Sequence, residues 1–370
     1  MNKIPSVNLA DFLSNDISKK QQFINDIGHA YENIGFVALK GHFLDDLLVD
    51  KLYEQIKRFF ELPTEVKRKY EVPGIGGQRG YVSFGKESAK GRKEGDLKEF
   101  WHFGQYVENN AELELEYPNN VFVDELPEFN QVGKTTYRML EKTAKYVLRS
   151  LAIHLGLEEK YFDQYIHNGN SILRPIHYPP IQSEPKNAVR AAAHGDINLI
   201  TLLMGAQGKG LQVQNLNGEW IDAIAEPDEI MINVGDMLSR HSNNRLKSTI
   251  HRVTNPPKEL WGTSRYSIPF FLHPISNMKL NVLEGCIDQN NPKEFEDIIL
   301  WNVFKDIQHG FYIDIGASHP EINSVTKNFY DNDWTGINIE PSYQFFYKYL
   351  DARPNDINLN IAIGNKKSDK

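Results

Sequence analysis

The sequence has few of the features that mark membrane, secreted or nucleic-acid-binding proteins. One cysteine, Cys286, excludes an internal disulfide and any metal site that needs several thiolates. No apolar run approaches the ~20 residues of a membrane helix, and the first residues contain no apolar signal core. The net charge of -8 offers no attraction to nucleic acid or to an anionic membrane. These absences predict a cytoplasmic protein with a small-molecule partner, in which nitrogen and oxygen atoms hold any metal.

The residue pattern changes near residue 170. Before it, apolar residues at helical spacing predict helices over 16–31, 48–59 and 131–155, with a strand at 34–39. After it come short apolar runs, bounded by Gly, Asn, Asp and Pro, with no helical pattern between them. Such a succession predicts an antiparallel sandwich or barrel. The predicted strands are SILRPIHY, INLITLLM, LQVQ, EIMINV, STIHRVT and RYSIPFFL.

A second change follows a polar stretch near residue 292. The run GFYIDIGASHP (310–320) predicts a strand that enters a glycine turn, and WTGINIEP (334–341) predicts a strand that ends in an acid. This βαβ pattern, typical of a partial Rossmann-like α/β segment, differs from the preceding all-β region. We therefore expect two parts, 1–295 and 296–370.

A candidate metal site begins at AAAHGDINLI (191–200). On a strand, His194 and Asp196 would point to the same side and present an imidazole and a carboxylate to one ion. With 12 histidines and 49 acids, however, a chance His-x-Asp is expected, and the pair is equally compatible with a polar strand edge. His251, in another predicted strand, completes two histidines and one carboxylate. This set is the facial triad of non-haem Fe(II) oxygenases, although zinc accepts the same ligands.

A second pair lies on the strand after His251. Arg265 and Ser267 are also two residues apart in RYSIPFF, so a guanidinium and a hydroxyl would share one side. An arginine fork binds carboxylates in a fixed bidentate geometry. An isolated Arg-x-Ser is usually a surface feature, but behind a metal triad it predicts a site for a co-substrate carboxylate.

Together these motifs resemble the Fe(II)/2-oxoglutarate-dependent oxygenases of the isopenicillin N synthase-like family, over about residues 4–295. The resemblance rests on HGD, HRV and RYS, in that order, and on LRPIHYPP, NVGDML, IGFVALKGH, IPSVNL, RGYVSFG and DLKEFWHFG. It implies a double-stranded β-helix (jelly roll) core at about 166–275, with an N-terminal helical region at about 1–165. It also implies Fe(II) on His194, Asp196 and His251. The far carboxylate of 2-oxoglutarate is then expected on Arg265 and Ser267, with the Tyr178 hydroxyl contributing.

The implied reaction is the oxidative decarboxylation of 2-oxoglutarate to succinate and CO2, coupled to the use of molecular oxygen and, most often, to hydroxylation of a small molecule. Two alternatives within the fold remain open. One is an ethylene-forming enzyme that fragments 2-oxoglutarate. The other is an oxidase that uses no 2-oxoglutarate and clamps its own substrate with Arg265 and Ser267. A non-catalytic jelly-roll binding protein would have no need of three metal ligands.

Several neighbouring residues carry further expectations. The glycine- and lysine-rich loop 73–98 and the segment FWHFG are expected to shape the substrate pocket. Arg174 and His177 fit the core and the active-site lining equally well. The remaining polar residues have a structural or solvent-exposed interpretation: Asn233, Gly235 and Asp236 in a turn, and Lys86, Lys90, Arg92 and Lys93 either on a solvated face or gripping an anionic substrate.

Residues 296–370 resemble the N-terminal part of the FkbM-type S-adenosylmethionine-dependent methyltransferases. Asp314, Gly316 and Glu340 match a strand, a turn and a ribose-binding acid of such a site. The segment is too short for a complete domain, so we expect a vestigial site, with S-adenosylmethionine bound only if the domain were complete. A bifunctional oxygenase-methyltransferase would require the missing residues.

Overall fold

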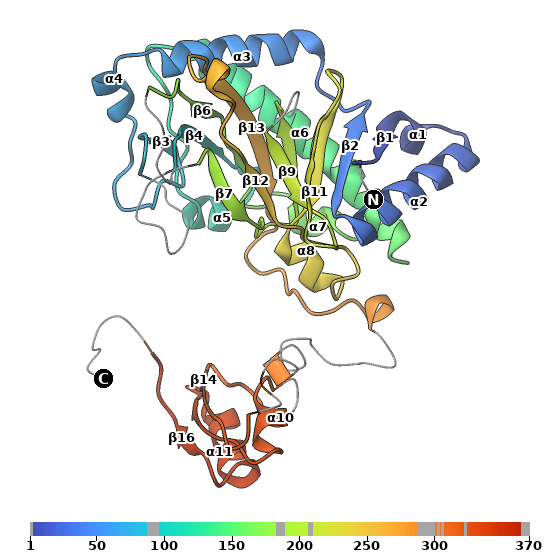
Figure 1. Cartoon of the computed structure of the whole chain (residues 1–370), viewed down its shortest axis with the longest axis vertical. Coiled ribbons are helices and arrows are strands. Elements are labelled where there is room, and N and C mark those ends of the chain that lie inside the picture. The colour runs from blue at the N-terminus through green and yellow to red at the C-terminus, as the bar shows by residue number, and fades with distance from the viewer. Residues whose placement is uncertain are drawn as a thin grey trace. The chain divides into compact units, whose positions relative to one another are not determined.

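The structure, a computed structural model, divides into two compact units. They are Met1–Cys286 and Ile287–Lys370, and each is described by itself (Figure 1). The described residues are 3–86, 96–182, 189–205, 210–287, 300–301, 304, 307–321 and 324–363. Among them, no helix combines the length and the apolar character needed to cross a membrane.

Helices dominate the first half of the N-terminal unit, as the apolar spacing predicts. The longest, α6, packs its buried stripe against strands of the main sheet and against helices α2 and α3. Asp16 and Asp45 cap α2 and α3 by accepting hydrogen bonds from backbone amides of the first turn. The helices of this half are α1 (Leu9–Leu13), α2 (Ile17–Asn33), α3 (Asp46–Phe60), α4 (Thr64–Arg68), α5 (Ala111–Glu116), α6 (Pro127–His154) and α7 (Asp163–Ile166).

Two sheets form the β core of the N-terminal unit. The 9-stranded sheet has the order β1-β2-β11-β8-β13-β5-β4-β3, with β6 paired to β13 and β4, and the 4-stranded sheet has the order β10-β9-β12-β7. All pairs are antiparallel except β1 with β2. The strands are β1 (Ser6–Asn8), β2 (Phe36–Lys40), β3 (Gly80–Val82), β4 (Glu99–Gly104), β5 (Ile172–Leu173), β6 (Ile176–Tyr178), β7 (Ala191–His194), β8 (Ile200–Met204), β9 (Leu211–Gln214), β10 (Trp220–Asp222), β11 (Ile230–Val234), β12 (His251–Val253) and β13 (Arg265–Leu272).

Apolar side chains join the two sheets. Phe36 on β2, Met231 on β11 and Val213 on β9 belong to one buried cluster, so the small sheet packs over this part of the large one. Helix α8 (Asp236–His241) follows β11, and two short 3-10 helices, η1 (Lys258–Leu260) and η2 (Glu284–Cys286), lie in later loops. The two packed antiparallel sheets confirm the predicted barrel-like β core.

Several strands are shorter than the sequence predicts. SILRPIHY is interrupted between β5 and β6 at Arg174 and Pro175, because proline has no amide hydrogen for a sheet ladder. The strand before the His-x-Asp motif ends at His194, so Asp196 lies beyond it. The prediction that His194 and Asp196 share one continuous strand is therefore wrong.

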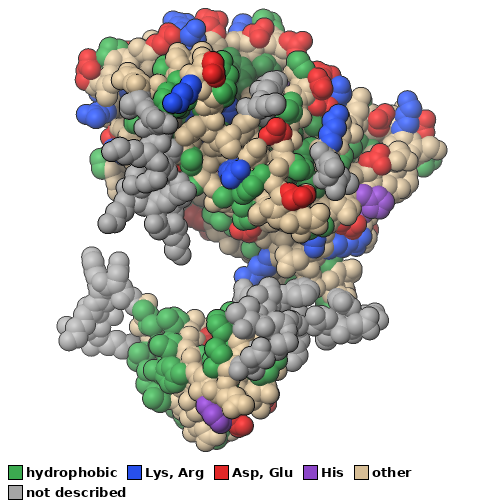
Figure 2. All heavy atoms as spheres, viewed as in Figure 1, with side chains coloured by type: hydrophobic (Ala, Val, Ile, Leu, Met, Phe, Trp, Pro, Cys, Tyr) green, Lys and Arg blue, Asp and Glu red, His purple; other side chains and the backbone are tan. Residues whose placement is uncertain are grey.

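The C-terminal unit contains a 3-stranded parallel sheet of order β14-β15-β16. Its elements are β14 (Phe311–Ile315), α10 (Lys327–Tyr330), β15 (Thr335–Ile339), α11 (Tyr343–Ala352) and β16 (Ile357–Leu359). Phe311, Ile313 and Ile315 alternate along β14 as exposed residues, and Figure 2 shows hydrophobic side chains gathered on this unit. The parallel strands agree with the predicted βαβ pattern, but a sheet of this size does not by itself support a Rossmann-like domain.

Candidate iron and co-substrate site

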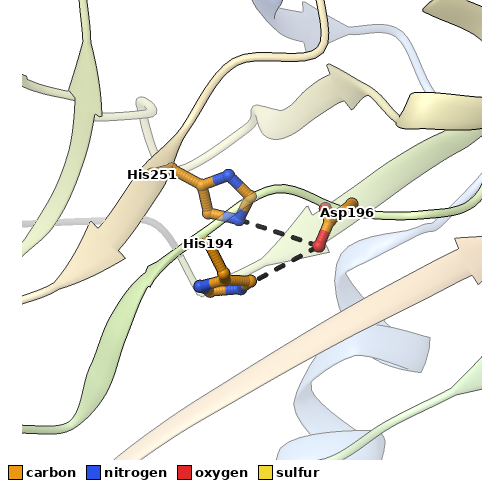
Figure 3. A group of neighbouring side chains, drawn as sticks. All are labelled: His194, Asp196 and His251. Atoms are coloured by element: carbon orange, nitrogen blue, oxygen red, sulfur yellow. Dashed lines mark ion pairs between the residues drawn. The ribbon is translucent and has the colours of Figure 1, made fainter. Parts of the chain in front are cut away.

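Strands β7 and β12 bring two histidines together at one end of the small sheet. His194 and His251 are direct partners in the antiparallel register, and their ring centroids lie 4.4 Å apart. Asp196 completes the group from the loop after β7, with its Oδ1 atom 4.0 Å from Nε2 of His194 and 3.8 Å from Nε2 of His251 (Figure 3). One ligand atom from each residue lies within 4.8 Å of the others. Backbone pairing across the sheet therefore gathers residues that are far apart in the chain.

The tautomer of each histidine is determined by the backbone. Nδ1 of His194 lies 2.7 Å from the carbonyl oxygen of Ala192, and Nδ1 of His251 lies 3.1 Å from that of Thr249. A carbonyl oxygen only accepts, so each Nδ1 carries the proton and donates it. In the neutral form of each ring, Nε2 therefore keeps the free lone pair that metal ligation through Nε2 requires.

The two oxygens of Asp196 have different surroundings. Oδ2 accepts hydrogen bonds from Oγ1 of Thr201 at 2.7 Å and from Nδ2 of Asn233 at 2.8 Å, whereas Oδ1 faces the two imidazoles. Thr201 and Asn233 are register partners on β8 and β11, so the sheet presents both donors side by side. The backbone amide of Asp236 also donates to the Asp196 carbonyl at 2.7 Å and tethers the loop to α8. The carboxylate is thus oriented before any ion binds.

The protonation tendencies of the group suit a cation. Burial would raise the pKa of Asp196, but the charge of His251 and the hydrogen bonds from Asn233 and Thr201 outweigh it and hold that pKa below its usual value. Burial, together with the neighbouring His251, lowers the pKa of His194. The acid is therefore ionised and the imidazole of His194 neutral near pH 7. Among the three, the His194 side chain is 46% exposed and Asp196 only 7%, so solvent reaches the group past His194.

Arg265, Ser267 and Tyr178 meet on the neighbouring strands β13 and β6. Arg265 pairs with Tyr178 in the register, and its guanidinium carbon lies 5.4 Å from the Tyr178 ring centroid. Nη2 of Arg265 donates to the carbonyl of Gly205 at 3.4 Å, but its buried Nη1 has no hydrogen-bond partner among the described residues. Ser267 is buried two positions along the same strand, on the same side as Arg265. A buried guanidinium hydrogen without a partner is the feature expected where a carboxylate binds.

Arg190 packs against the same tyrosine and is not predicted from the sequence. Its guanidinium carbon lies 5.5 Å from the Tyr178 ring centroid, and it lines a cavity of about 680 Å³ together with Arg265. Thr201 and Asn233 were missed in a similar way, since Thr201 was not singled out and Asn233 was assigned to a turn. The available signal was a polar residue within an apolar strand, which requires a buried partner.

Other predicted pocket residues have mixed outcomes. Loop residues that include Gly74 and Gly77 line a second cavity of about 560 Å³ with Phe100. Lys86 lines it as well and pairs with Glu71 at 2.6 Å, an arrangement that holds the lysine on the protein surface. Lys90, Arg92 and Lys93 lie outside the described residues.

Arg174 and His177 are both engaged by protein groups. Nε of Arg174 donates to Nε2 of His102 at 2.5 Å. His177 bridges the Glu99 carboxylate at 2.8 Å and the Ser264 hydroxyl at 3.0 Å, and its ring stacks on Tyr266. These contacts favour the structural interpretation of His177.

The predicted nucleoside-binding residues of the C-terminal unit also have protein partners. The two carboxylate oxygens of Glu340 accept hydrogen bonds from the amides of Ser318 and Ser342, each at 2.7 Å. Asp314 accepts from the Thr326 hydroxyl at 2.7 Å, and Gly316 adopts a positive φ of 73° in the turn. Glu340 therefore already joins the turn to the end of β15.

Comparison with known proteins assigns the N-terminal unit. Residues 4–125 match the model of the non-haem dioxygenase in morphine synthesis N-terminal family, and residues 169–274 match that of the 2OG-Fe(II) oxygenase superfamily. A crystal structure of a 2OG-Fe(II) oxygenase family protein from Caulobacter crescentus is 38% identical, covers 83% of this chain and 99% of its own, and has a TM-score of 0.73. The chain belongs to the 2OG-Fe(II) oxygenase superfamily. It is an Fe(II)- and 2-oxoglutarate-dependent dioxygenase, and its jelly-roll core is the one that the resemblance implied.

Further relatives of this oxygenase agree with that assignment. A 2-oxoglutarate-Fe(II) type oxidoreductase of Aspergillus fumigatus is 32% identical over 279 residues, which are 72% of this chain and 81% of the relative. A full-length Neurospora crassa protein, solved in complex with alpha-KG and thymine, is 29% identical with a TM-score of 0.69 and covers 78% of this chain and 92% of its own. Both family matches end at or before residue 274, so they lend no support to the methyltransferase resemblance of residues 296–370.

Proposed function

We propose that His194, Asp196 and His251 hold the Fe(II) ion of this oxygenase. The observation that carries the proposal is the placement of the ligand atoms, since Oδ1 of Asp196 lies 4.0 Å from Nε2 of His194 and 3.8 Å from Nε2 of His251. Two imidazoles and one carboxylate suit non-haem Fe(II) and leave positions open for a co-substrate and oxygen.

The co-substrate is expected to lie between this group and β13. Arg265, with its unpartnered Nη1, would bind the far carboxylate of 2-oxoglutarate, while Ser267 and the Tyr178 hydroxyl would donate further hydrogen bonds. The likeness to the Neurospora crassa structures that contain alpha-KG supports this arrangement over an oxidase that uses no 2-oxoglutarate.

The bound iron would supply the oxygen chemistry, in which 2-oxoglutarate is decarboxylated to succinate and CO2. The chain's own residues prepare that chemistry. Thr201 and Asn233 fix the plane of the Asp196 carboxylate, and the carbonyls of Ala192 and Thr249 fix the imidazole tautomers. Arg265 would set the distance of the co-substrate from the ion by holding its far end.

We propose hydroxylation of a small organic molecule as the outcome. Relatives at similar identity carry different substrates in their names: a proline hydroxylase of Petromyces alliaceus at 29% and a homoarginine-6-hydroxylase of Arabidopsis thaliana at 30%. Identity at this level therefore does not choose among substrates. The segments expected to distinguish them are the loop of 71–86 and β4, which line the cavity of about 560 Å³.

Anaerobic reconstitution tests this proposal. Fe(II) and 2-oxoglutarate should produce a visible chelate absorbance band, and oxygen should then yield succinate. We expect His251→Ala to abolish Fe(II) binding, and Arg265→Gln to keep Fe(II) but to require at least tenfold more 2-oxoglutarate, since a charge-assisted hydrogen bond is lost. His29→Ala, at an exposed histidine on α2, serves as the matched control. Equal loss of Fe(II) in the His251 and Arg265 variants would contradict the assigned roles.

We propose that the chain comprises an oxygenase domain over 1–295 and a methyltransferase-like segment without its own activity over 296–370. Its vestigial nucleoside site would comprise Asp314, Gly316 and Glu340. Because the amides of Ser318 and Ser342 hold both oxygens of Glu340 within the turn, we expect no measurable heat when S-adenosylmethionine is titrated into the full chain. Saturable binding at micromolar concentration would refute this assignment.

A further inference from the structure

Two arginines pack around one tyrosine ring beside the oxygenase site. The guanidinium carbons of Arg190 and Arg265 lie 5.5 Å and 5.4 Å from the centroid of Tyr178. Arg190 is 6% exposed and stands immediately before β7, the strand that carries His194. Its own backbone amide donates to the side chain of Asn255 at 3.0 Å, which fixes the point from which the side chain extends.

Both guanidinium groups retain unsatisfied hydrogen-bonding capacity. Nε of Arg190 and Nη1 of Arg265 are buried and have no hydrogen-bond partner in the described part of the chain, and neither arginine forms an ion pair there. An arginine cannot lose its proton to relieve burial, so an anion or solvent must meet these groups. Burial lowers the pKa of Arg190, and the nearby charge of Arg265 lowers it further, which indicates that the two charges act on each other.

The cavity beside them has no acid to balance the two charges. It measures about 680 Å³, and its described lining contains Arg190 and Arg265 but neither aspartate nor glutamate. Arg252 offers a contrast on the neighbouring strand β12. It packs on Trp220, and its Nε and Nη2 both donate to Gln212, so its hydrogen bonds are met by the protein. Arg79 and Arg353 also bury an Nε without a partner, but among the described lining of this cavity the arginines with an unpartnered nitrogen are the two around Tyr178.

We infer that Arg190 binds the far carboxylate of 2-oxoglutarate together with Arg265, so that two guanidinium groups select for a dicarboxylic co-substrate. The inference rests on the proposed function, which assigns that carboxylate to Arg265. A second positive group at this end would discriminate 2-oxoglutarate from 2-oxo acids that end in a methyl group, because only the dicarboxylate satisfies both arginines.

The test compares two co-substrates on the anaerobic Fe(II)-loaded protein. The chelate absorbance band gives a dissociation constant for 2-oxoglutarate and for 2-oxopentanoate, which has a methyl group in place of the far carboxylate. We expect Arg190→Gln to raise the dissociation constant of 2-oxoglutarate about tenfold or more and to leave that of 2-oxopentanoate within about twofold of the wild type. Arg190→Lys keeps the charge but not the guanidinium fork, so its dissociation constant for 2-oxoglutarate should lie between those of the wild type and of Arg190→Gln. Arg252→Gln is the matched control. Thermal stabilisation of the metal-free protein by glutarate should also fall in Arg190→Gln.

The outcomes separate the inference from the proposed function. If Arg265→Gln weakens the binding of 2-oxoglutarate and Arg190→Gln does not, Arg190 has no part in this site, while the proposed role of Arg265 stands. If neither variant changes the constant, both assignments fail. An equal loss for the two co-substrates in Arg190→Gln and in Arg190→Lys would show a general disturbance of the site and would overturn the inference.

Discussion

Asn233 offers the sharpest test of how the oxygenase orients its proposed metal ligands. Its amide is one of two donors to Oδ2 of Asp196, at 2.8 Å, and the carboxylate is 7% exposed. Asn233→Leu would remove the donor while nearly conserving volume. A hydrogen bond to a buried charge contributes about 1.5–3 kcal/mol, and loss of such an outer partner typically weakens metal binding about 10–100-fold. Because Thr201 remains as the second donor, we expect the lower half of that range, about 10–30-fold.

The pH dependence gives a second, independent readout. Asn233 helps to keep the pKa of Asp196 low against the effect of burial, so its loss must raise that pKa. Protons compete with the ion for the carboxylate, and metal binding should therefore fail at a higher pH in the variant. Competition with a colorimetric chelator under anaerobic conditions, repeated from pH 5 to 8, measures both effects.

The controls concern the partner donor and the fold. Thr201→Val should also weaken Fe(II) binding. The double variant should lose more Fe(II) affinity than either single variant, because both described donors to Oδ2 are then gone. A correctly folded Asn233→Leu protein, as judged by urea denaturation, that binds Fe(II) as tightly as the wild type with an unchanged pH midpoint would refute this reasoning.

Two further predictions concern stability. Glu99 accepts a hydrogen bond from Lys67 at 2.8 Å inside the protein, so Glu99→Gln leaves a buried ammonium without its counter-ion. The free energy of unfolding, measured by urea denaturation, should fall by about 3–5 kcal/mol. Glu54→Gln, at an exposed ion pair with Arg58, should change it little. Burial would raise the pKa of Asp163, but hydrogen bonds from Arg149 hold that pKa below its usual value. The resulting stability is present above the unfolded pKa of about 3.9 and is lost as the pH falls through the lower folded pKa. Asp163→Asn should thus cost about 1 kcal/mol at pH 7 and less at pH 2, and an equal cost at both values would contradict the assignment.

Much of the site could be predicted because its residues follow local rules. His194, Asp196 and His251 have the residue types that iron requires, and Arg265 and Ser267 lie two apart on a strand, so periodicity alone places them on one side. Strands such as β9 and β13 match the predicted runs LQVQ and RYSIPFFL in full. These features depend only on neighbouring residues or on chemistry that few side chains provide.

The residues that were missed depend on how distant strands align. Asn233 reaches Asp196 only because β11 pairs with β8 in a register that sets it opposite Thr201. Arg190, immediately before β7, reaches Tyr178 on β6, and no spacing along the chain reveals that contact. The end of β7 at His194 was likewise invisible, since the apolar run continues on the other side of Asp196. Register and strand ends arise from the packed sheet as a whole, so one sequence does not disclose them.

Strand β7 lies at the outer edge of the small sheet among the described strands and pairs only with β12, whereas β12 has a neighbour on each side. An edge strand opens locally at a lower free energy than an interior one, and opening β7 would withdraw His194 from His251 and from Asp196, which Thr201 and Asn233 hold in place. An ion bound across β7 and β12 would oppose that opening. Amide exchange at Ala191–His194 should therefore slow when metal is added, far more than along β13. Inactivation by chelators would then begin as fraying of a single strand, with the remainder of the oxygenase still folded.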